Sequence, residues 1–367
     1  MTRAVNNRVI TPERTETPIV INGDMAIAQR GTSQTGQTGN HFPVDRFGFQ
    51  MDTFGTWTSS QSTDVPTGQG FAKSLKLDCT TADASLGAGH FGFISHRFEG
   101  QNLQLLKKGT SNAEKVTISF WVKSNKTGNY VTELFDVDNT RQISQLYSIS
   151  SADTWEQKVM TFAADTTGAL GDDNGHSLAI HWVLGAGSTY SSGTLNTSWA
   201  ANNNANRWVG GPNLADSTDN EWYMTGLQLE IGDFNADTIP PFQFEDTGTS
   251  LARCQRYFIS HAIADGTRLG DGIFRSTTRV VGNVDNTGLL HNMRTTPSVA
   301  TTITSFQVYH GADTTTNSAA TSGTGFAMSG THEVRTDFTF SSGSTTAGYP
   351  GKLRANSAGA MQYDAEL

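Results

Sequence analysis

Apolar and polar residues alternate along short stretches of this chain, and turn-forming residues separate the stretches. The alternation is regular at 74–78 (SLKLD) and 116–122 (VTISFWV), which is the period of a strand with one buried face. Residues 177–184 (SLAIHWVL) are nearly all apolar and suit a central strand covered on both faces. Turns are marked by clusters of Gly, Asn and Asp at 125–129, 168–175 and 202–206. The pattern predicts an all-β chain that begins with an antiparallel jelly-roll β-sandwich.

One segment departs from this pattern, because its apolar residues recur at helical spacing. A helix over about 249–262, capped by Thr249 or Ser250, would carry an apolar stripe on one side. The stripe consists of Leu251, Cys254, Tyr257 and Phe258. A stripe this narrow either docks on a sheet or meets copies of itself around a symmetry axis. These four residues are therefore candidates for an interface between copies.

The same reading divides the chain into four parts. A polar arm (1–21) precedes the jelly-roll domain (22–246), a helical linker (247–264) and a second, smaller β domain (265–367). The arm contains two prolines, and a segment of this composition is held either by a neighbouring subunit or by its own domain. The final residues, MQYDAEL, alternate and suit a last edge strand.

Composition and charge narrow the classes of function. Charged residues make up only 16% of the 367 positions and glycine occurs 38 times, which is typical of a β-rich chain with many turns. The net charge of −9 opposes nonspecific binding to nucleic acid. No apolar run approaches the length of a membrane span or of a signal core. Cys79 and Cys254 have no metal-type spacing, and we expect both to be packed as free thiols after cytosolic synthesis.

The seven tryptophans fall into two groups. Trp121, Trp182 and Trp222 lie among apolar strand residues, so we expect them in the core. The other four lie beside polar or glycine-rich sequence, and Trp199 and Trp208 within SWAANNNANRW are the best pair for stacking on sugar rings. The competing interpretation, to which we give more weight, is that these two fill loop bases or subunit contacts.

Catalytic and metal-binding motifs are sparse. Asp233, Asn235 and Asp237 reproduce the opening of a calcium loop, but Thr238 and Phe244 occupy its sixth and twelfth positions, where Gly and Glu are required. The alternatives are a looser structural Ca²⁺ site and a solvated turn, and the turn is favoured. The zinc-protease motif, the nucleophile elbow and the P-loop are all absent from the sequence. We expect no enzymatic activity and no cofactor beyond such an ion.

Several phrases of the sequence carry a resemblance to a known group of proteins. They are NGDMAIAQRGTS, VDRFGF, ISFWVKS, DTWEQKVMTF, GLQLEIG, HNMRTTPSV and the terminal YDAEL, in this order. Together they resemble bacteriophage tail-fibre and virion-appendage proteins that have a jelly roll like carbohydrate-binding modules and a C-terminal β module. The resemblance covers nearly the whole chain. It departs at 233–240, where the connector is longer than usual.

The resemblance implies a virion structural protein, most simply a tail fibre. Such a protein is made in the host cytoplasm, is released by lysis, forms homotrimers and binds host-surface glycans. The arm would dock on another virion protein of the tail, the portal or adaptor, or the capsid. A capsid decoration or cement protein is the alternative. A capsule depolymerase is less favoured, because it requires a groove with paired carboxylates.

Overall fold

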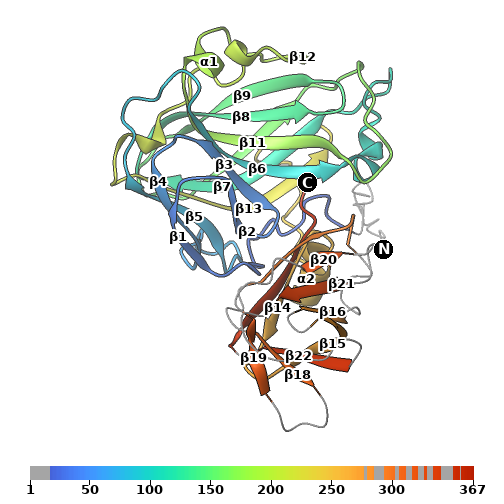
Figure 1. Ribbon diagram of the computed structural model, residues 1–367. Coiled ribbons are helices and arrows are strands. Elements are labelled where there is room, and N and C mark those ends of the chain that lie inside the picture. The colour runs from blue at the N-terminus through green and yellow to red at the C-terminus, as the bar shows by residue number, and fades with distance from the viewer. Residues whose placement is uncertain are drawn as a thin grey trace, which may run out of the picture.

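The computed structural model describes residues 17–276, 279–284, 293–301, 306–310, 316–320, 326–328, 334–339, 350–355 and 357–367. Of the residues in these ranges, those within 268–284 and 301–354 are described by their backbone alone. Most of the predicted arm, 1–16, therefore lies outside the described residues. Figure 1 shows a large jelly roll and a smaller β module, with the end of the chain at the junction between them. Among the described residues, no helix is long and apolar enough to cross a membrane.

Two antiparallel sheets form the jelly roll, as the alternation predicts. Sheet A has the order β1 (Ser33–Gln37), β4 (Thr56–Ser62), β5 (Ser74–Thr81), β13 (Glu221–Ile231), β7 (Val116–Ser124) and β10 (Glu156–Phe162). Sheet B has the order β12 (Ala200–Ala201), β9 (Arg141–Ile149), β8 (Gly128–Asp136), β11 (His176–Ala186), β6 (Phe91–Glu99), β3 (Phe47–Asp52) and β2 (His41–Val44). The apolar run at 177–184 lies in β11, between β6 and β8, which confirms that it is a central strand.

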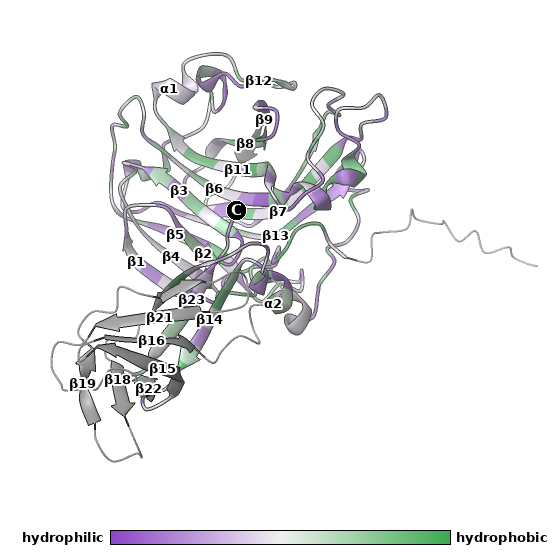
Figure 2. Cartoon of the chain, turned by 45° about the vertical axis from the view of Figure 1, so that its right-hand side comes forward, coloured by the Kyte–Doolittle hydropathy of each residue, from purple (hydrophilic) through white to green (hydrophobic). Residues whose placement is uncertain are grey.

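The core fills the space between the two sheets. Trp57, Trp182 and Trp222 are completely buried there, together with aromatic and aliphatic residues that alternate along each strand. Figure 2 shows this distribution, with hydrophobic residues along the strands and hydrophilic residues concentrated in the loops. Burial of alternate apolar side chains from both sheets is the main source of stability in such a sandwich.

The smaller module begins with α2 (Thr247–Gln255), which is shorter than the predicted helix. Asp246 caps it, since its carboxylate accepts a hydrogen bond from the Thr249 N–H at 3.0 Å. The rest of the predicted helix is a strand, β14 (Phe258–Ile263), in a sheet of order β14–β23 (Gly359–Asp364)–β17 (Ser298–Thr301). The terminal segment is thus the middle strand of this sheet, and the prediction of an edge strand was wrong.

A second sheet completes the module. Its order is β19 (Thr316–Ala320), β18 (Phe306–His310), β22 (Pro350–Ala355), β15 (Arg268–Ser276), β16 (Arg279–Val284), β21 (Val334–Thr339) and β20 (Phe326–Met328). All of its described pairings are antiparallel. The chain is therefore all-β apart from short helices, as predicted.

Five short helical segments lie in the connections between the strands of the jelly roll. They are η1 (Gly100–Asn102) and η2 (Gln104–Leu106) after β6, and α1 (Ser188–Ser191), η3 (Asn204–Asn206) and η4 (Leu214–Asp216) between β11 and β13.

Candidate functional site

The outer face of sheet B is largely occupied by the chain itself. The long connection between β11 and β13 folds over it and is fixed by Glu133, whose side chain is completely buried. Its carboxylate accepts hydrogen bonds from Arg207 at 2.7 and 2.9 Å, from the Trp208 indole at 3.0 Å, and pairs with His181 at 2.8 Å. Burial alone would raise the pKa of Glu133, but the charge and hydrogen bonds of Arg207 overcome it and hold the pKa at about 2.

This arrangement rules out Trp199 and Trp208 as a sugar-binding pair. Trp208 is only 2% exposed and packs against Val131 and Val183 on sheet B. Trp199 instead packs against the main core, and its indole donates a hydrogen bond to the Ala163 carbonyl at 2.8 Å. The two rings belong to different hydrophobic clusters, and the prediction that they act together was wrong.

The residues that resembled a calcium loop form an ordinary turn. Asp233 pairs with Lys115 at 2.6 Å. The Asn235 side-chain oxygen accepts hydrogen bonds from the backbone N–H groups of Asp237 at 2.9 Å and Thr238 at 3.1 Å. These oxygens do not converge on a common point, and no group of three metal-ligating side chains occurs in the part of the chain that the structure describes. The contacts of these residues are those of a turn, and the looser Ca²⁺ site stays a prediction.

The apolar stripe of α2 docks inside the chain rather than against another copy. Cys254, Tyr257 and Phe258 are between 0 and 3% exposed, and Leu251 is partly buried beside them. Their partners include Ile21 and Ile27, so residues 18–21 of the predicted arm pack with the jelly roll. Side chains that are buried within the chain cannot contact another copy. Their assignment to an oligomer interface is therefore corrected.

The outer face of sheet A is different, because it carries a partly exposed tryptophan on β7, next to the edge strand β10. The inward residues of β7 are Val116, Ile118, Phe120 and Val122, so Trp121 points outward. Cross-strand pairing places Trp121 between Thr225 of β13 and Gln157 of β10, whose side chain is exposed. The prediction that Trp121 belongs to the core was wrong.

A second row of this face lies two residues further along the strands, in the order Lys76, Tyr223, Lys123. Trp155, in the turn before β10, meets the Tyr223 ring edge-on with centroids 6.1 Å apart, and its indole donates to Asp64 at 2.9 Å. We call the outward residues Trp121, Lys123, Trp155, Gln157 and Tyr223 the Trp121 face. Tyr223 and Lys123 are buried, at 7% and 9% exposure, so Trp121, Trp155 and Gln157 supply the accessible surface of the face.

The lysines on this side of sheet A are held by carboxylates. Lys123 pairs with Asp64, and its ammonium lies 4.3 Å from the centroid of the Tyr223 ring. Lys76 pairs with Glu221 at 2.6 Å, and the Tyr223 hydroxyl donates to the same carboxylate at 2.6 Å. Burial, together with Glu221, raises the pKa of Tyr223 well above its usual value. The hydroxyl therefore stays protonated and keeps the ring in a fixed position.

An aromatic triad borders the Trp121 face. Phe71, Phe242 and Phe244 meet with ring centroids 4.8 to 5.2 Å apart, and Phe244 is 48% exposed. The Phe71 ring sits over Gly226, directly after Thr225, where any Cβ would come within 2.5 Å of the ring. The two other rings come from the connector between β13 and α2 (232–246), directly after its unusually long stretch at 233–240. Its Pro240 carbonyl accepts a hydrogen bond from the Gln228 side chain at 2.9 Å.

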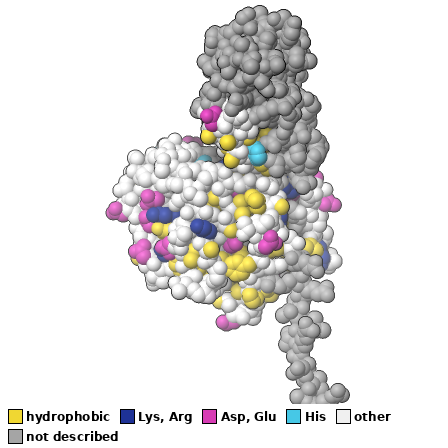
Figure 3. Space-filling view, turned by 90° about the horizontal axis from the view of Figure 1, so that it is seen from below, with side chains coloured by type: hydrophobic (Ala, Val, Ile, Leu, Met, Phe, Trp, Pro, Cys, Tyr) yellow, Lys and Arg dark blue, Asp and Glu magenta, His cyan; other side chains and the backbone are white. Residues whose placement is uncertain are grey.

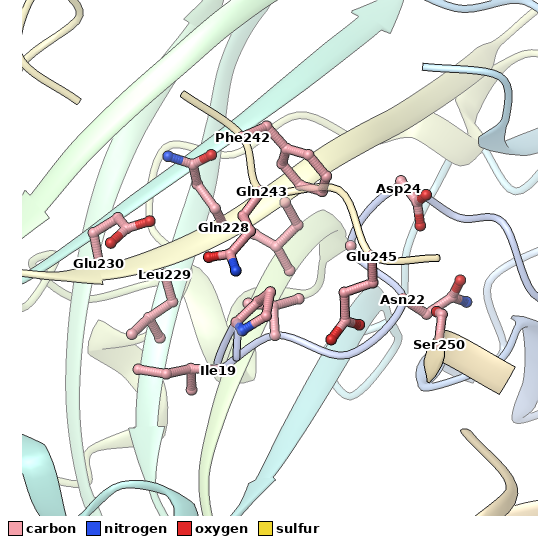
Figure 4. A pocket seen from close by; sticks show the side chains of 14 residues that line it. Ile19, Asn22, Asp24, Gln228, Leu229, Glu230, Phe242, Gln243, Glu245 and Ser250 are labelled. Atoms are coloured by element: carbon pink, nitrogen blue, oxygen red, sulfur yellow. The ribbon is translucent and has the colours of Figure 1, made fainter. Parts of the chain in front are cut away.

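Cavities elsewhere in the described chain are less suited to a sugar. Figure 4 shows a small cavity between the segment with Ile19 and Asn22 and the connector with Phe242, Gln243 and Glu245. Its volume of about 40 Å³ admits water but no sugar ring. A wider depression of about 500 Å³ is lined partly by Arg253 and Arg256, which are already paired with Glu245 and Glu99.

Charged side chains are sparse on one face of the jelly roll, and the absence of nucleic-acid binding stays a prediction. On the jelly-roll face shown in Figure 3, basic side chains are isolated, acidic ones are scattered, and hydrophobic ones gather toward the middle. A surface that binds a polyanion would carry a continuous basic patch. This face has none among its described residues.

Comparisons with known proteins show a distant likeness of fold. No family model and no curated protein matches the sequence. A bacteriophage CBA120 tailspike protein 4 domain matches at 12% identity and TM-score 0.28, over 58% of this chain and 21% of that one. A family 11 carbohydrate-binding module from Clostridium thermocellum matches at 12% identity and TM-score 0.25. The match covers 56% of this chain and 99% of that module. A family 30 carbohydrate-binding module matches at 9% identity and TM-score 0.27. The match covers 59% of this chain and 93% of that module. Similarity at this level says nothing about ligands.

Proposed function

We propose that this chain is a non-catalytic glycan-binding protein and that the Trp121 face contacts the sugar. The observation that carries the proposal is the outward, partly exposed ring of Trp121 on β7 of sheet A, beside the exposed residue Gln157 of β10. The flat side of an indole covers the apolar C–H face of a sugar ring, while neighbouring amides bond its hydroxyls. Rings set on a sheet suit this task because the strands hold them in place before binding.

We further propose that the protein is part of a phage virion, as a tail fibre or comparable appendage. The resemblance of its sequence phrases to such proteins supports this location. Several copies on one particle would strengthen weak single sites, because later contacts form at high effective concentration. Any contact between copies, including a homotrimer, would need surfaces other than the buried stripe of α2. Electron microscopy of the native particle with this chain labelled would locate it, and a label absent from all particles would reject the virion role.

The Trp121→Ala variant tests the sugar-binding role. Because the ring supplies the stacking surface, we expect affinity for the glycan that the unaltered protein binds on an array to fall at least about tenfold, or about 1.4 kcal/mol. Trp121→Phe, which keeps a smaller ring, should retain part of the affinity. Trp199→Ala is the matched control, since Trp199 is also a partly buried tryptophan of the jelly roll but lies against the core.

Thermal unfolding of each variant checks that the fold is retained. Normal binding by a folded Trp121→Ala protein would exclude this face as the site. Failure of the unaltered protein to bind any glycan, either on the array or on host cells, would reject the function itself.

A further inference from the structure

We infer that the binding surface extends from Trp121 to the aromatic triad, so that the ligand is a stretch of several sugar units inside a glycan chain. This inference rests on the proposed function. A single sugar needs one aromatic platform, whereas the structure presents two groups of rings on the same side of sheet A.

Strand pairing fixes the two groups close together. Trp121 of β7 is paired with Thr225 of β13, and the next residue of β13 is Gly226. Gly226 has a φ of 66°, and its missing side chain leaves room for the Phe71 ring. Neighbouring strands lie roughly 4.8 Å apart, so the triad begins about one strand away from Trp121. That is the scale on which consecutive units of a glycan chain follow each other.

The exposure of Phe244 points to a ligand rather than to packing alone. Phe71 is 7% exposed, as expected for a ring whose only role is to pack a loop against the sheet. Phe244 packs on Phe71 and Phe242 and still leaves 48% of its surface open. An exposed aromatic held by two others has a fixed orientation, so it loses little conformational freedom when a second sugar ring covers it.

Position on the sheet also favours one continuous ligand. The connector residue Pro240 is bonded to Gln228, and β13 pairs Gln228 with Ser119, two residues from Trp121 on β7. The connector therefore runs along the border of the Trp121 face before it supplies Phe242 and Phe244. Thr225 lies between them and is completely buried, with its hydroxyl donating to the Lys73 carbonyl at 2.7 Å, so a chain laid from Trp121 toward the triad crosses the segment at Lys73.

The test measures affinity against ligand length with the full chain. Cello-, xylo-, malto- and chito-oligosaccharides of two to six units serve as probes, and titration calorimetry follows any series that binds. We expect affinity to rise at least about tenfold from the shortest to the longest member. The Phe244→Ala variant should lose this rise while keeping the affinity for the shortest member. Phe244→Trp, which retains a ring, should preserve the rise.

The controls separate this inference from the proposed function. Leu146→Ala removes a side chain of similar exposure, 44%, from sheet B and should change nothing. Affinity that does not depend on length, or a folded Phe244→Ala protein with the full length dependence, would overturn the extended site. Trp121→Ala should weaken every length equally. If it weakens none, the Trp121 face itself is rejected, and the extended site is rejected with it.

Discussion

Glu133 illustrates how one buried carboxylate can organise a loop that is distant in sequence. It receives hydrogen bonds from Arg207 and Trp208, more than 70 residues further along the chain, as well as from His181 on the neighbouring strand. Removing one partner from such a cluster leaves an uncompensated buried charge, which costs about 3–5 kcal/mol. The cluster therefore holds the β11–β13 connection over sheet B.

His176 gives a prediction about pH. Burial lowers its pKa from 6.5 to about 3, so the ring is neutral in the folded protein at pH values where the unfolded chain already binds a proton. The stability from this neutral ring is complete above pH 6.5 and is lost as the pH falls from 6.5 toward 3. His176→Gln cannot titrate, so its free energy of unfolding should fall less steeply between pH 6.5 and 4.5, by at most about 1.4 kcal/mol per pH unit. Urea unfolding of both proteins across this pH range checks the prediction. Parallel curves of unfolding free energy against pH would contradict it.

The tryptophans show which residue roles the sequence could reveal. Period-two alternation along VTISFWV puts Val116, Ile118, Phe120 and Val122 on one face, and the same count puts Trp121 on the other. That signal was available but was masked by the apolar neighbours of Trp121. Trp208 carried no comparable signal, because its burial depends on Glu133, 75 residues earlier in the chain. The local pattern predicts which face of a strand a residue lies on. It does not predict polar partners that are distant in the sequence.

At the scale of elements, β13 positions the proposed binding surface. Its pairing with β7 shifts between Thr225 and Gln228, and Gly226 makes this irregularity with a left-handed backbone. The sequence predicted the turn at 233–237, which follows β13, and a helix after it. The amphipathic stripe of α2 showed that one side is buried. It could not show which residues that side packs against, because its partners Ile21 and Ile27 lie more than 200 residues away in the sequence.

Gly226→Ala tests this arrangement. The new Cβ would lie 2.5 Å from the Phe71 ring, so the ring must move and the triad should be displaced. We expect a loss of about 1–3 kcal/mol of stability from overpacking, in addition to the strain of a left-handed alanine. Gly210→Ala is the matched control, since Gly210 also has a positive φ, 89°, while its nearest neighbours would lie at ordinary contact distances. Equal unfolding free energies for the two variants, measured in urea, would show that Phe71 does not press on Gly226.

At the scale of the whole molecule, a buried polar network joins the jelly roll to the C-terminal module. Arg46 is 2% exposed, its guanidinium lies 3.4 Å from the Tyr257 ring centroid, and it pairs with Glu366. Arg97 donates a hydrogen bond to the Leu367 carbonyl, and the Ala365 N–H bonds the Tyr257 carbonyl at 2.8 Å. The two β modules were visible in the sequence, but this junction was not, because its partners come from opposite ends of the chain.

Glu366→Gln measures what the junction contributes. The substitution keeps the size of the side chain but removes the charge opposite Arg46, which has almost no access to water that could replace it. We expect the variant to lose on the order of 3 kcal/mol, the lower end of the range for breaking a buried pair. Glu114→Gln is the control, because the Glu114–Lys107 pair is exposed and should contribute less than about 1 kcal/mol. Scanning calorimetry should show an earlier first transition for Glu366→Gln alone, since the module can then separate before the jelly roll unfolds. Identical thermograms for the two variants would mean that apolar packing around Tyr257, and not the charge pair, holds the modules together.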